Sequence, residues 1–455
     1  MIKAIRGTRD LLPPDTALWD FVENTVRQVF AVYNFHEIRT PIFEATELFA
    51  RGVGEETDIV SKEMFTWEDR GRAESEKNQS LTLRPENTAG VVRAYIEHNL
   101  QQRGLNKLYY IGPQFRRERP QKGRYRQFYQ IGAEVIGPAS SGSESPVRDA
   151  ELLEMLAALL DRLGIQGWTL QLNSIGCAAD RVRYNEALRQ ALEPVKNKMC
   201  ADCQRRAVSN PLRVFDCKVP EDQPIIETLP RIGQFLDEPC RKHFGQVREI
   251  LSSAGVPFTL NDRLVRGLDY YTRTAFEVYP AGAEGQQSAI GGGGRYDGLV
   301  ELLGGRPTPG IGFGIGLDRV LLALDAAGRA AASDEGAPVA VVVGSDPADT
   351  VTRLRIATEL RAAGLASRAE LGARKLGKQL EAAARDGAHF AVIVGDELAG
   401  GQVQLRDLEA GTQRAIPAAS LARELERASR THRHGLDAAA GERGAAGGER
   451  GAAGS

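Results

Sequence analysis

The stretch Lys107-Leu-Tyr-Tyr-Ile-Gly-Pro-Gln-Phe-Arg-Arg-Glu-Arg-Pro-Gln-Lys-Gly-Arg-Tyr-Arg-Gln-Phe-Tyr-Gln-Ile-Gly-Ala-Glu-Val-Ile136 holds two apolar, tyrosine-rich segments. A basic loop that contains glycine and proline separates residues 107–111 from residues 128–136. Apolar segments on both sides of such a loop are typical of paired antiparallel strands. The stretch therefore predicts a long antiparallel hairpin.

The turn of this hairpin carries six cationic side chains and one acidic side chain between Arg116 and Arg126. Most charge runs are solvated surface loops, and that remains the alternative here. Arginine predominates, however, and its guanidinium makes bidentate contacts to phosphate, whereas lysine acts as a point charge. The composition of the loop favours a triphosphate or a nucleic-acid backbone as its partner.

Polar side chains occur close to the hairpin. Glu86 and Thr88, in Thr82-Leu-Arg-Pro-Glu-Asn-Thr88, lie at the start of a helix expected from about Thr88, and simple helix capping by Asn87 or Thr88 is the alternative to a binding role. Gln130 and Glu134 point to the same face of the second strand, because side chains alternate along a strand. This face is either the polar, acidic wall of a pocket or an ordinary solvent face.

Two motifs lie further along the chain. Leu264-Val-Arg-Gly-Leu-Asp-Tyr-Tyr271 joins one arginine to two tyrosines, and a turn with packed aromatic rings is its alternative reading. Glycine occupies every second position from Gly310 to Gly316, without the Gly-Lys-Ser/Thr ending of a phosphate-binding loop. Alternating glycines leave one strand face bare, either for a flat group such as adenine or for close packing of two backbones.

The pattern of elements changes along the chain and divides it into two domains. We expect a first domain over residues 1–325 that mixes antiparallel strands with helices and carries a mainly helical insertion at about 173–255. Residues 326–337, which are rich in small residues, predict a linker. Strands alternate with helices over 338–428, which indicates a small doubly wound α/β domain with a largely parallel core. The repetitive segment 429–455 predicts a disordered tail.

Shorter patterns place individual elements. Asp15 can cap a helix that runs to about Tyr33. Residues 35–43 predict one strand, which Pro41 restricts to a sheet edge or a strand end. Residues 258–265 predict another strand.

The composition is that of an ordinary folded protein: 455 residues, 42% of them hydrophobic, with 60 acidic and 58 basic side chains. The net charge of -2 does not by itself indicate a polyanionic partner, although a basic face can exist locally. No apolar run approaches the ~18 residues that span a bilayer, and the N-terminus lacks the apolar segment of a secretory signal. We therefore expect a cytoplasmic protein with no membrane partner.

Five cysteines are an odd and small number for a disulfide framework. Cys200 and Cys203, with Cys217 and Cys240 further on, are compatible with structural zinc. Only one Cys-x-x-Cys pair is present, however, and Cys177 does not begin a second. The sequence therefore does not establish a zinc site, and we predict no metal ligands.

Three segments together resemble histidyl-tRNA synthetase, a family of class II aminoacyl-tRNA synthetases. They are residues 83–128, the segment ending at Tyr271, and Gly310-Ile-Gly-Phe-Gly-Ile-Gly-Leu-Asp-Arg319. The resemblance covers residues 1–428. It implies an α+β fold, with a six-stranded antiparallel catalytic sheet, a helical insertion before the third motif, and a C-terminal α/β anticodon-binding domain.

The resemblance also implies the reaction. The family activates L-histidine with ATP, forms histidyl-adenylate and pyrophosphate, and transfers the histidyl group to the 3' end of tRNA(His). Expected partners are therefore L-histidine, ATP with Mg²⁺, and tRNA(His), but not DNA. A homodimer is expected too, because the first class motif, here about 35–44, forms part of the subunit interface in the family.

Site residues follow from the resemblance position by position. Three arginines would bind ATP and neutralise phosphate charge in catalysis: Arg116, Arg266 and Arg319. Six residues would bind histidine, with the acid and hydroxyl near the ammonium and the last acid and last tyrosine at the imidazole: Glu86, Thr88, Gln130, Glu134, Tyr270 and Tyr271. Four residues of the hairpin loop would reach the acceptor end of the tRNA: Arg119, Gln121, Lys122 and Arg124.

A catalytically inactive regulatory subunit of ATP phosphoribosyltransferase is the alternative. Such paralogues of the family generally lack the anticodon-binding domain and lose active-site arginines. The chain keeps all three arginines and has an α/β pattern after residue 337. These features favour the enzyme, and the segment from Arg266 to Tyr271 disfavours a synthetase for another amino acid.

Overall fold

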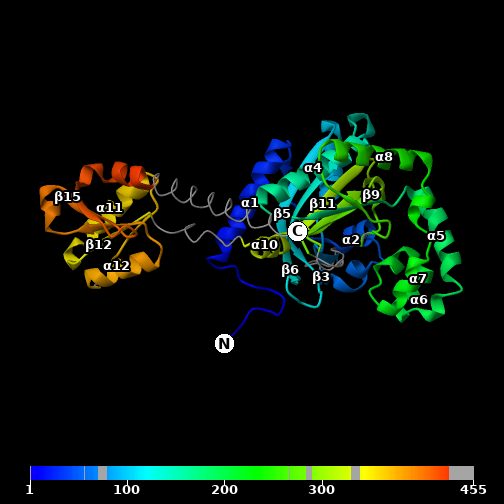
Figure 1. Cartoon of the computed structure of the whole chain (residues 1–455), viewed down its shortest axis with the longest axis horizontal. Coiled ribbons are helices and arrows are strands. Elements are labelled where there is room, and N and C mark those ends of the chain that lie inside the picture. The colour runs from blue at the N-terminus through cyan, green and yellow to red at the C-terminus, as the bar shows by residue number, and fades with distance from the viewer. Residues whose placement is uncertain are drawn as a thin grey trace, which may run out of the picture. The chain divides into compact units, whose positions relative to one another are not determined.

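The computed structural model describes residues 2–55, 57–69, 79–265, 267–282, 289–328, 339–372 and 374–429. The chain forms two compact units, of which the first ends at Ala330 and the second begins at Ala331 (Figure 1). Most of the expected linker and nearly all of the expected tail lie outside the described residues. No helix in the described ranges is long and apolar enough to cross a membrane.

An eight-stranded sheet forms the centre of the first unit, in the order β1-β5-β6-β11-β10-β9-β7-β8. In that order the strands are His36–Glu37, Asn106–Phe115, Gln127–Ile136, Gly310–Gly316, Gly291–Arg295, Thr272–Tyr279, Thr169–Ser174 and Thr259–Leu260. The six strands from β5 to β7 pair antiparallel, and the two-residue edge strands β1 and β8 add parallel pairs. This arrangement confirms the α+β prediction.

The predicted hairpin consists of β5 and β6. The two strands pair without interruption from Asn106 opposite Ile136 to Phe115 opposite Gln127. The basic loop between them therefore projects from the end of a regular ladder.

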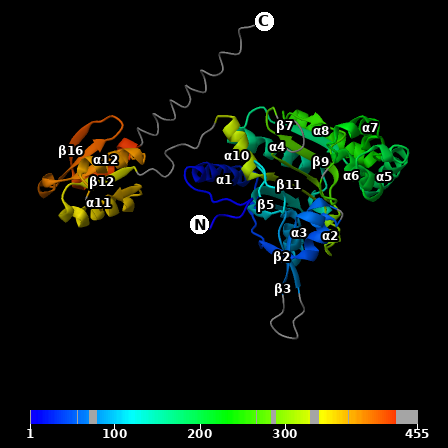
Figure 2. The ribbon, with the colours of Figure 1, turned by 90° about the horizontal axis from the view of Figure 1, so that it is seen from below.

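Helices cover both faces of the large sheet (Figure 2). One face packs its main apolar core against α1 (Asp15–Val32), α4 (Pro146–Leu163), α8 (Glu238–Ser253) and α10 (Leu317–Ala326). The other face packs against α3 (Thr88–Glu97) and α9 (Leu299–Leu302), while α2 (Thr46–Val53) contacts these two helices. Since side chains alternate along each strand, neighbouring residues of β6 and β11 belong to different cores.

A separate three-stranded sheet has the order β2-β4-β3, with strands Phe43–Ala45, Gln79–Leu83 and Phe65–Asp69. The prediction of one strand over 35–43 is therefore wrong, because its two ends join different sheets. The buried guanidinium of Arg84 accounts for the break: it donates to the backbone carbonyls of Thr40, at 2.9 Å, and Pro41, at 3.3 Å.

The helical insertion contains α5 (Ala178–Leu192), α6 (Ala201–Ser209) and α7 (Gln223–Glu227), with its own apolar core. The buried residues Val247 and Leu251 of α8 pack instead into the main core. The strand expected over 258–265 is mostly wrong, because only Thr259–Leu260 pairs. Asn261 then forms a turn by accepting the N–H of Arg263 at 3.0 Å.

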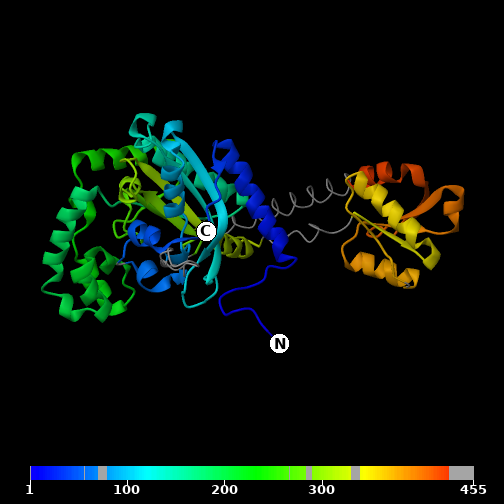
Figure 3. The same cartoon turned by 180° about the vertical axis from the view of Figure 1, so that it is seen from behind.

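The second unit is a five-stranded sheet in the order β13-β12-β14-β15-β16. Its strands are Ser367–Ala369, Ala340–Gly344, Phe390–Val394, Gln402–Asp407 and Gln413–Pro417. The first three are parallel and the last two antiparallel, so the sheet is mixed rather than largely parallel, and β16 was not predicted. Helix α11 (Thr350–Ala362) and the helical residues 421–429 cover one face, and α12 (Leu376–Arg385) covers the other (Figure 3).

Candidate active site

A cavity of about 420 Å³ lies beside the hairpin and the glycine-rich strands β10 and β11. Four of the residues selected from the sequence line it: Arg116, Arg124, Gln130 and Arg319. The insertion also contributes to its wall, through Lys218 among others. Segments that are far apart in the sequence therefore enclose one polar space.

Arg116 is held at the start of the hairpin loop. Its Nε donates to the carbonyl of Pro85 at 2.9 Å, and its guanidinium lies 5.2 Å from the ring centroid of Phe128. Its Nη1 is 3.8 Å from Glu118, too far for a hydrogen bond. The backbone and ring contacts fix the position of a charge that faces the cavity.

Arg319 lies in the first turn of α10 and donates through Nη1 to the carbonyl of Ala289. Burial lowers the pKa of its guanidinium, and the positive charges of Arg124 and Arg116 lower it further. Like charges within one cavity repel each other, and a bound anion relieves that repulsion. These arginines therefore favour a phosphate group between them.

Alternating glycines divide one face of β11 into two halves. Built onto the backbone, a Cβ at Gly312 would lie 1.7 Å from Oε2 of Glu134, and one at Gly310 would lie 2.3 Å from the Tyr296 ring. At Gly314, by contrast, the nearest atom is Nε2 of Gln130 at 3.5 Å, and this half lines the cavity. Two glycines therefore make room for neighbouring side chains and two leave an open wall, and the binding of a flat group such as adenine against that wall stays a prediction.

Glu134 is fully buried beside this strand and lies next to Thr88. Its Oε1 accepts from the hydroxyl of Thr88 at 2.7 Å, and its Oε2 accepts from the phenol of Tyr296 at 2.6 Å. Tyr296 was not identified from the sequence. Gly310 is the sequence feature that could have pointed to it, because the missing side chain at that position makes room for the Tyr296 ring rather than for a cofactor.

Burial raises the pKa of Glu134 from its ordinary value near 4.5 to about 8. The two hydroxyl donors oppose this rise, and the nearby Glu86 adds to it. At neutral pH the Glu134 carboxyl is therefore largely protonated until a cation or a hydrogen-bond donor approaches it.

Glu86 sits at the start of α3, where it accepts the N–H groups of Thr88 at 2.8 Å and Ala89 at 3.0 Å. These bonds cap the helix from Glu86 rather than from Asn87 or Thr88, the capping residues that the sequence suggests, and the side chain of Asn87 makes no cap hydrogen bond. Burial nevertheless raises the pKa of Glu86. The same carboxyl thus stabilises the helix and lies close enough to Glu134 to raise its pKa.

Tyr270 and Tyr271 lie in the same buried aromatic cluster. Their ring centroids are 4.6 Å apart, and the centroid of Tyr270 is 5.9 Å from that of Tyr296. Burial raises the pKa of Tyr270, and the nearby Tyr271, Glu86 and Glu134 raise it further. The structure therefore groups the two tyrosines with both carboxyls.

The loop residues predicted to contact tRNA do not all share one environment. Arg119, Gln121 and Lys122 are exposed. Arg124 is half-buried in the cavity wall, where Nη1 donates to Glu118 at 3.0 Å. Arg124 and Gln121 also exchange backbone hydrogen bonds across the tip, and the turn requires a positive φ of 76° at Gly123.

Arg266, which was selected from the sequence, lies outside the described residues. Its neighbours Val265 and Gly267 both line the cavity.

Two cysteine-containing clusters lie in the insertion. One joins Cys200, Cys203 and Cys217 to Asp222, and the other joins Cys177 and Cys240 to Asp180 and Asp237. The sequence had grouped Cys240 with the first three, and the structure places it in the other cluster.

Known proteins match this chain over almost its whole length. A family profile described as histidyl-tRNA synthetase matches residues 7–320, and an anticodon binding domain profile matches residues 338–428. The histidine-tRNA ligase of Koribacter versatilis is 64% identical over 426 residues, which cover 93% of this chain and 95% of the relative. That of Solibacter usitatus is 51% identical over 432 residues, with coverage of 94% and 100%.

Among solved structures, the crystal structure of apo histidyl-tRNA synthetase from Staphylococcus aureus matches with a TM-score of 0.77 and 37% identity. The match covers 93% of this chain and 100% of that chain. The resemblance drawn from the sequence motifs is confirmed. The chain belongs to the histidyl-tRNA synthetase family.

Proposed function

We propose that this protein activates L-histidine with ATP and transfers the histidyl group to the 3' end of tRNA(His). Relatives named histidine-tRNA ligase support the reaction, as does the presence of both family domains in one chain. The observation that carries the proposal is the cavity itself. It combines arginines suited to phosphate with a bare glycine wall, next to a buried cluster of Glu134, Thr88 and tyrosines.

In the first step, a carboxylate oxygen of histidine attacks the α-phosphorus of ATP and the bond to the bridging oxygen of pyrophosphate breaks. Arg116 and Arg319 hold the phosphates and neutralise the charge that develops on them, together with Arg266. The open half of the β11 glycine face accommodates the flat adenine ring. Mg²⁺ accompanies ATP, and Glu277 is a carboxylate of the cavity wall that suits a hard cation.

Histidine is recognised by the buried cluster. An imidazole has one N–H donor and one nitrogen acceptor when it is neutral, so a carboxyl and a phenol together can read both. Glu134 and Tyr271 serve this purpose. The subsite is completed by Glu86, Thr88 and Tyr270. Gln130, which lies nearer the cavity, binds the carboxylate or the ammonium group of histidine. Tyr296 is a positioning residue, because its phenol donates to Glu134.

In the second step, the 3' end of tRNA(His) enters beside the hairpin loop. Arg119, Gln121 and Lys122 are exposed there and can contact the sugar-phosphate backbone, while Arg124 reaches into the cavity. Residues 1–325, with the insertion at about 173–255, would carry the chemistry, and residues 338–428 would bind the anticodon. The reaction supplies protein synthesis, which places it in the cytoplasm.

We also propose that the protein acts as a homodimer. Phe43 and Trp67, with rings 6.0 Å apart, are 52% and 40% exposed on the small sheet β2-β4-β3, and Ile42 beside them is 45% exposed. Contiguous exposed apolar side chains of this kind are typical of protein interfaces. The patch includes residues of the first class motif, so a second copy of the chain is its expected partner.

Pyrophosphate exchange with ATP, measured with each standard amino acid in turn, tests the proposed activity. We expect exchange with histidine alone, followed by charging of tRNA(His). The regulatory-subunit alternative requires no exchange with any amino acid, and the ligase relatives do not favour it. Exchange with a different amino acid would contradict the histidine assignment, since the buried cluster would then read another side chain.

A further inference from the structure

Three cysteines and one aspartate in the helical insertion surround a single point. Cys200 and Cys203 lie at the start of α6, Cys217 follows the short helical turn Pro211–Asp216, and Asp222 precedes α7. Their three sulfur atoms and one carboxylate oxygen all lie within 4.8 Å of one another. Four ligand atoms from three separate pieces of backbone are thus brought together.

The distances resemble those around a tetrahedral metal ion rather than a disulfide. Sγ of Cys200 is 3.9 Å from Sγ of Cys217, and the latter is 3.1 Å from Oδ2 of Asp222. Zn–S distances of about 2.3 Å at tetrahedral angles place two sulfur atoms about 3.8 Å apart. The five cysteines are all free, and a disulfide would need sulfur atoms about 2.05 Å apart.

The charge of Asp222 gives an independent reason for a cation. Its side chain is 1% exposed, and among the described residues no lysine, arginine or histidine forms an ion pair with it. Its partners are the N–H of Cys200, at 3.0 and 3.3 Å from its two oxygens, and the thiol of Cys217. A buried carboxylate without a cation is costly, and a metal ion at the centre of the cluster would balance it.

The backbone also prepares Cys217 to act as a ligand. The N–H of Val219 donates to Sγ of Cys217 at 3.4 Å. This contact orients the sulfur of Cys217 within the cluster.

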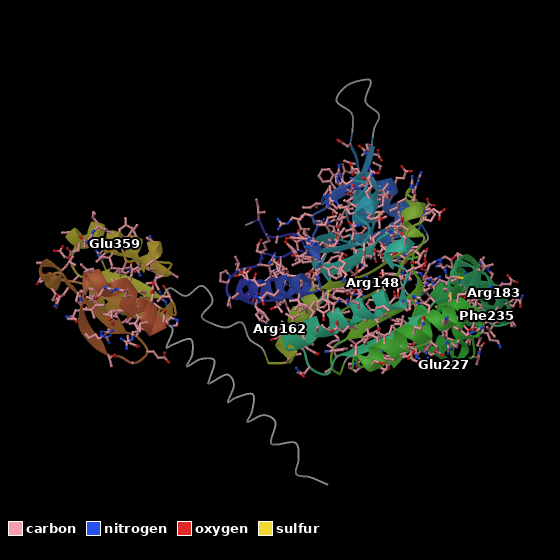
Figure 4. The ribbon with its side chains drawn as sticks, turned by 90° about the horizontal axis from the view of Figure 1, so that it is seen from above. Arg148, Arg162, Arg183, Glu227, Phe235 and Glu359 are labelled. Atoms are coloured by element: carbon pink, nitrogen blue, oxygen red, sulfur yellow. The ribbon has the colours of Figure 1, made fainter. Side chains whose placement is uncertain are left out.

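The second cluster has its ligand atoms within the same 4.8 Å limit, but its carboxylates have other partners, and it serves as an internal comparison. Asp180 accepts the N–H of Cys177 at 3.1 Å and pairs with Arg183 at 2.5 Å, a residue labelled in Figure 4. Asp237 caps α8 by accepting the N–H of Cys240 at 2.8 Å. Helix capping and one arginine therefore account for both of its carboxylates.

We propose that Cys200, Cys203, Cys217 and Asp222 bind one structural Zn²⁺ ion. Thiolates select zinc over the hard cations Mg²⁺ and Ca²⁺, and four protein ligands close the coordination sphere, as in other structural sites. This proposal replaces the expectation of no metal from the sequence. The ion ties α6 to residues 211–222, and since Lys218 of that segment lines the catalytic cavity, it also braces the cavity wall.

The test is the metal content of the full chain, purified without a metal-affinity tag or chelator from zinc-supplemented cells. Elemental analysis should find about one zinc ion per chain. Cys200→Ser and Asp222→Asn should each lower the content by at least about ten-fold, whereas the control Cys177→Ser should keep it. The proposal is overturned if the wild type holds less than about one ion per ten chains. It is equally overturned if Cys200→Ser retains its zinc or if Cys177→Ser loses it.

Cobalt provides a readout that does not depend on the folding of variants. The wild-type protein, stripped of metal and reconstituted with Co²⁺, should show thiolate-to-cobalt charge transfer and the intense visible bands of tetrahedral cobalt. Weak bands typical of six oxygen ligands, or no bands at all, would overturn the site. Neither measurement depends on histidine or tRNA, so a failure here is separate from a failure of the proposed function.

Discussion

Glu134 illustrates how the surroundings of one residue set its chemistry. The same carboxyl that the sequence placed on a strand face is fully buried, accepts two hydroxyl hydrogen bonds, and has a pKa raised by burial to about 8. A group with such a pKa can change protonation when histidine binds at neutral pH. Two predictions concern this residue.

The first concerns histidine affinity. If Glu134 receives the imidazole N–H, Glu134→Gln keeps the size of the side chain but offers a mismatched donor. A hydrogen bond to a charged group contributes roughly 1.5 to 3 kcal/mol, so histidine affinity should fall by about ten- to a hundred-fold. ATP affinity should remain unchanged, because the arginines lie elsewhere. Paired titrations of one variant measure both, and equal losses for the two ligands would assign Glu134 a structural role.

The second concerns stability without ligand. Because the folded pKa of Glu134 is raised, its contribution to stability is fully present below the ordinary pKa near 4.5 and is lost as pH rises through about 8. Within that window the folded carboxyl keeps a proton that the unfolded chain has released. The free energy of unfolding therefore falls by about 1.4 kcal/mol for each pH unit of increase. Urea unfolding at several pH values should therefore show a weaker decline for Glu134→Gln. A pH dependence identical to that of wild type would mean that the carboxyl is not shifted.

Arg266 is the residue for which sequence motifs alone supply the expectation. Arg266→Ala should reduce the rate of adenylate formation by about 100- to 1,000-fold, because a short side chain cannot neutralise charge on the α-phosphate. Arg263→Ala is the matched control, since Arg263 binds Gln223 and Glu227 of the insertion instead. Single-turnover adenylation measures the effect, and a rate within a few-fold of wild type would remove Arg266 from the mechanism.

At the scale of elements, the strand β11 borders two binding regions, the buried carboxyl of Glu134 and the open wall of the cavity. Gly312 pairs directly with Glu134 on β6, and Gly314 pairs with Gly132. The absence of a side chain at Gly312 therefore makes room for the carboxyl of Glu134. At Gly314 the absence of a side chain only leaves open space.

This difference predicts two unlike alanine variants. Gly312→Ala would place its Cβ 1.7 Å from Oε2 of Glu134 and must displace that carboxyl, whereas Gly314→Ala has its nearest neighbour at 3.5 Å. A misplacement of about 1 Å can cost about 100-fold in rate, so kcat/KM for histidine should collapse in the first variant, whereas the second should mainly raise the KM for ATP, because its methyl group lies on the proposed adenine surface. Steady-state exchange kinetics with histidine and ATP varied in turn test this, and similar losses in both variants would contradict it.

At the scale of the whole molecule, the division after Ala330 separates activation from tRNA selection in the proposed function. A chain ending at Gly328 should retain histidine-dependent pyrophosphate exchange, while charging of tRNA(His) should fall sharply. The reason is that all cavity residues precede that point. Circular dichroism provides the folding control, and normal charging by the folded truncated protein would show that residues 338–428 are dispensable for tRNA. Deletion of residues 435–455 should alter neither activity.

Sequence alone was sufficient for the order of elements, the long hairpin, the α+β class and the family. Strand alternation, helix periodicity and turn residues are local properties, and the motifs around Arg116 and Gly310 are contiguous. The same local reasoning failed for residues 35–43, because it cannot detect that Arg84, 43 and 44 residues away from its carbonyl partners in the sequence, holds the chain between two sheets.

Tertiary structure decided which side chains meet. Tyr296 reaches Glu134 across 162 residues only because β6, β11 and β10 pair in their observed register. Likewise, Cys240 joins Cys177, and Asp222 joins the other cysteines, through the packing of the insertion. Contacts between distant segments depend on register and packing, which no local pattern encodes, and they determine both the raised pKa of the buried acid and the ligand set of the proposed metal site.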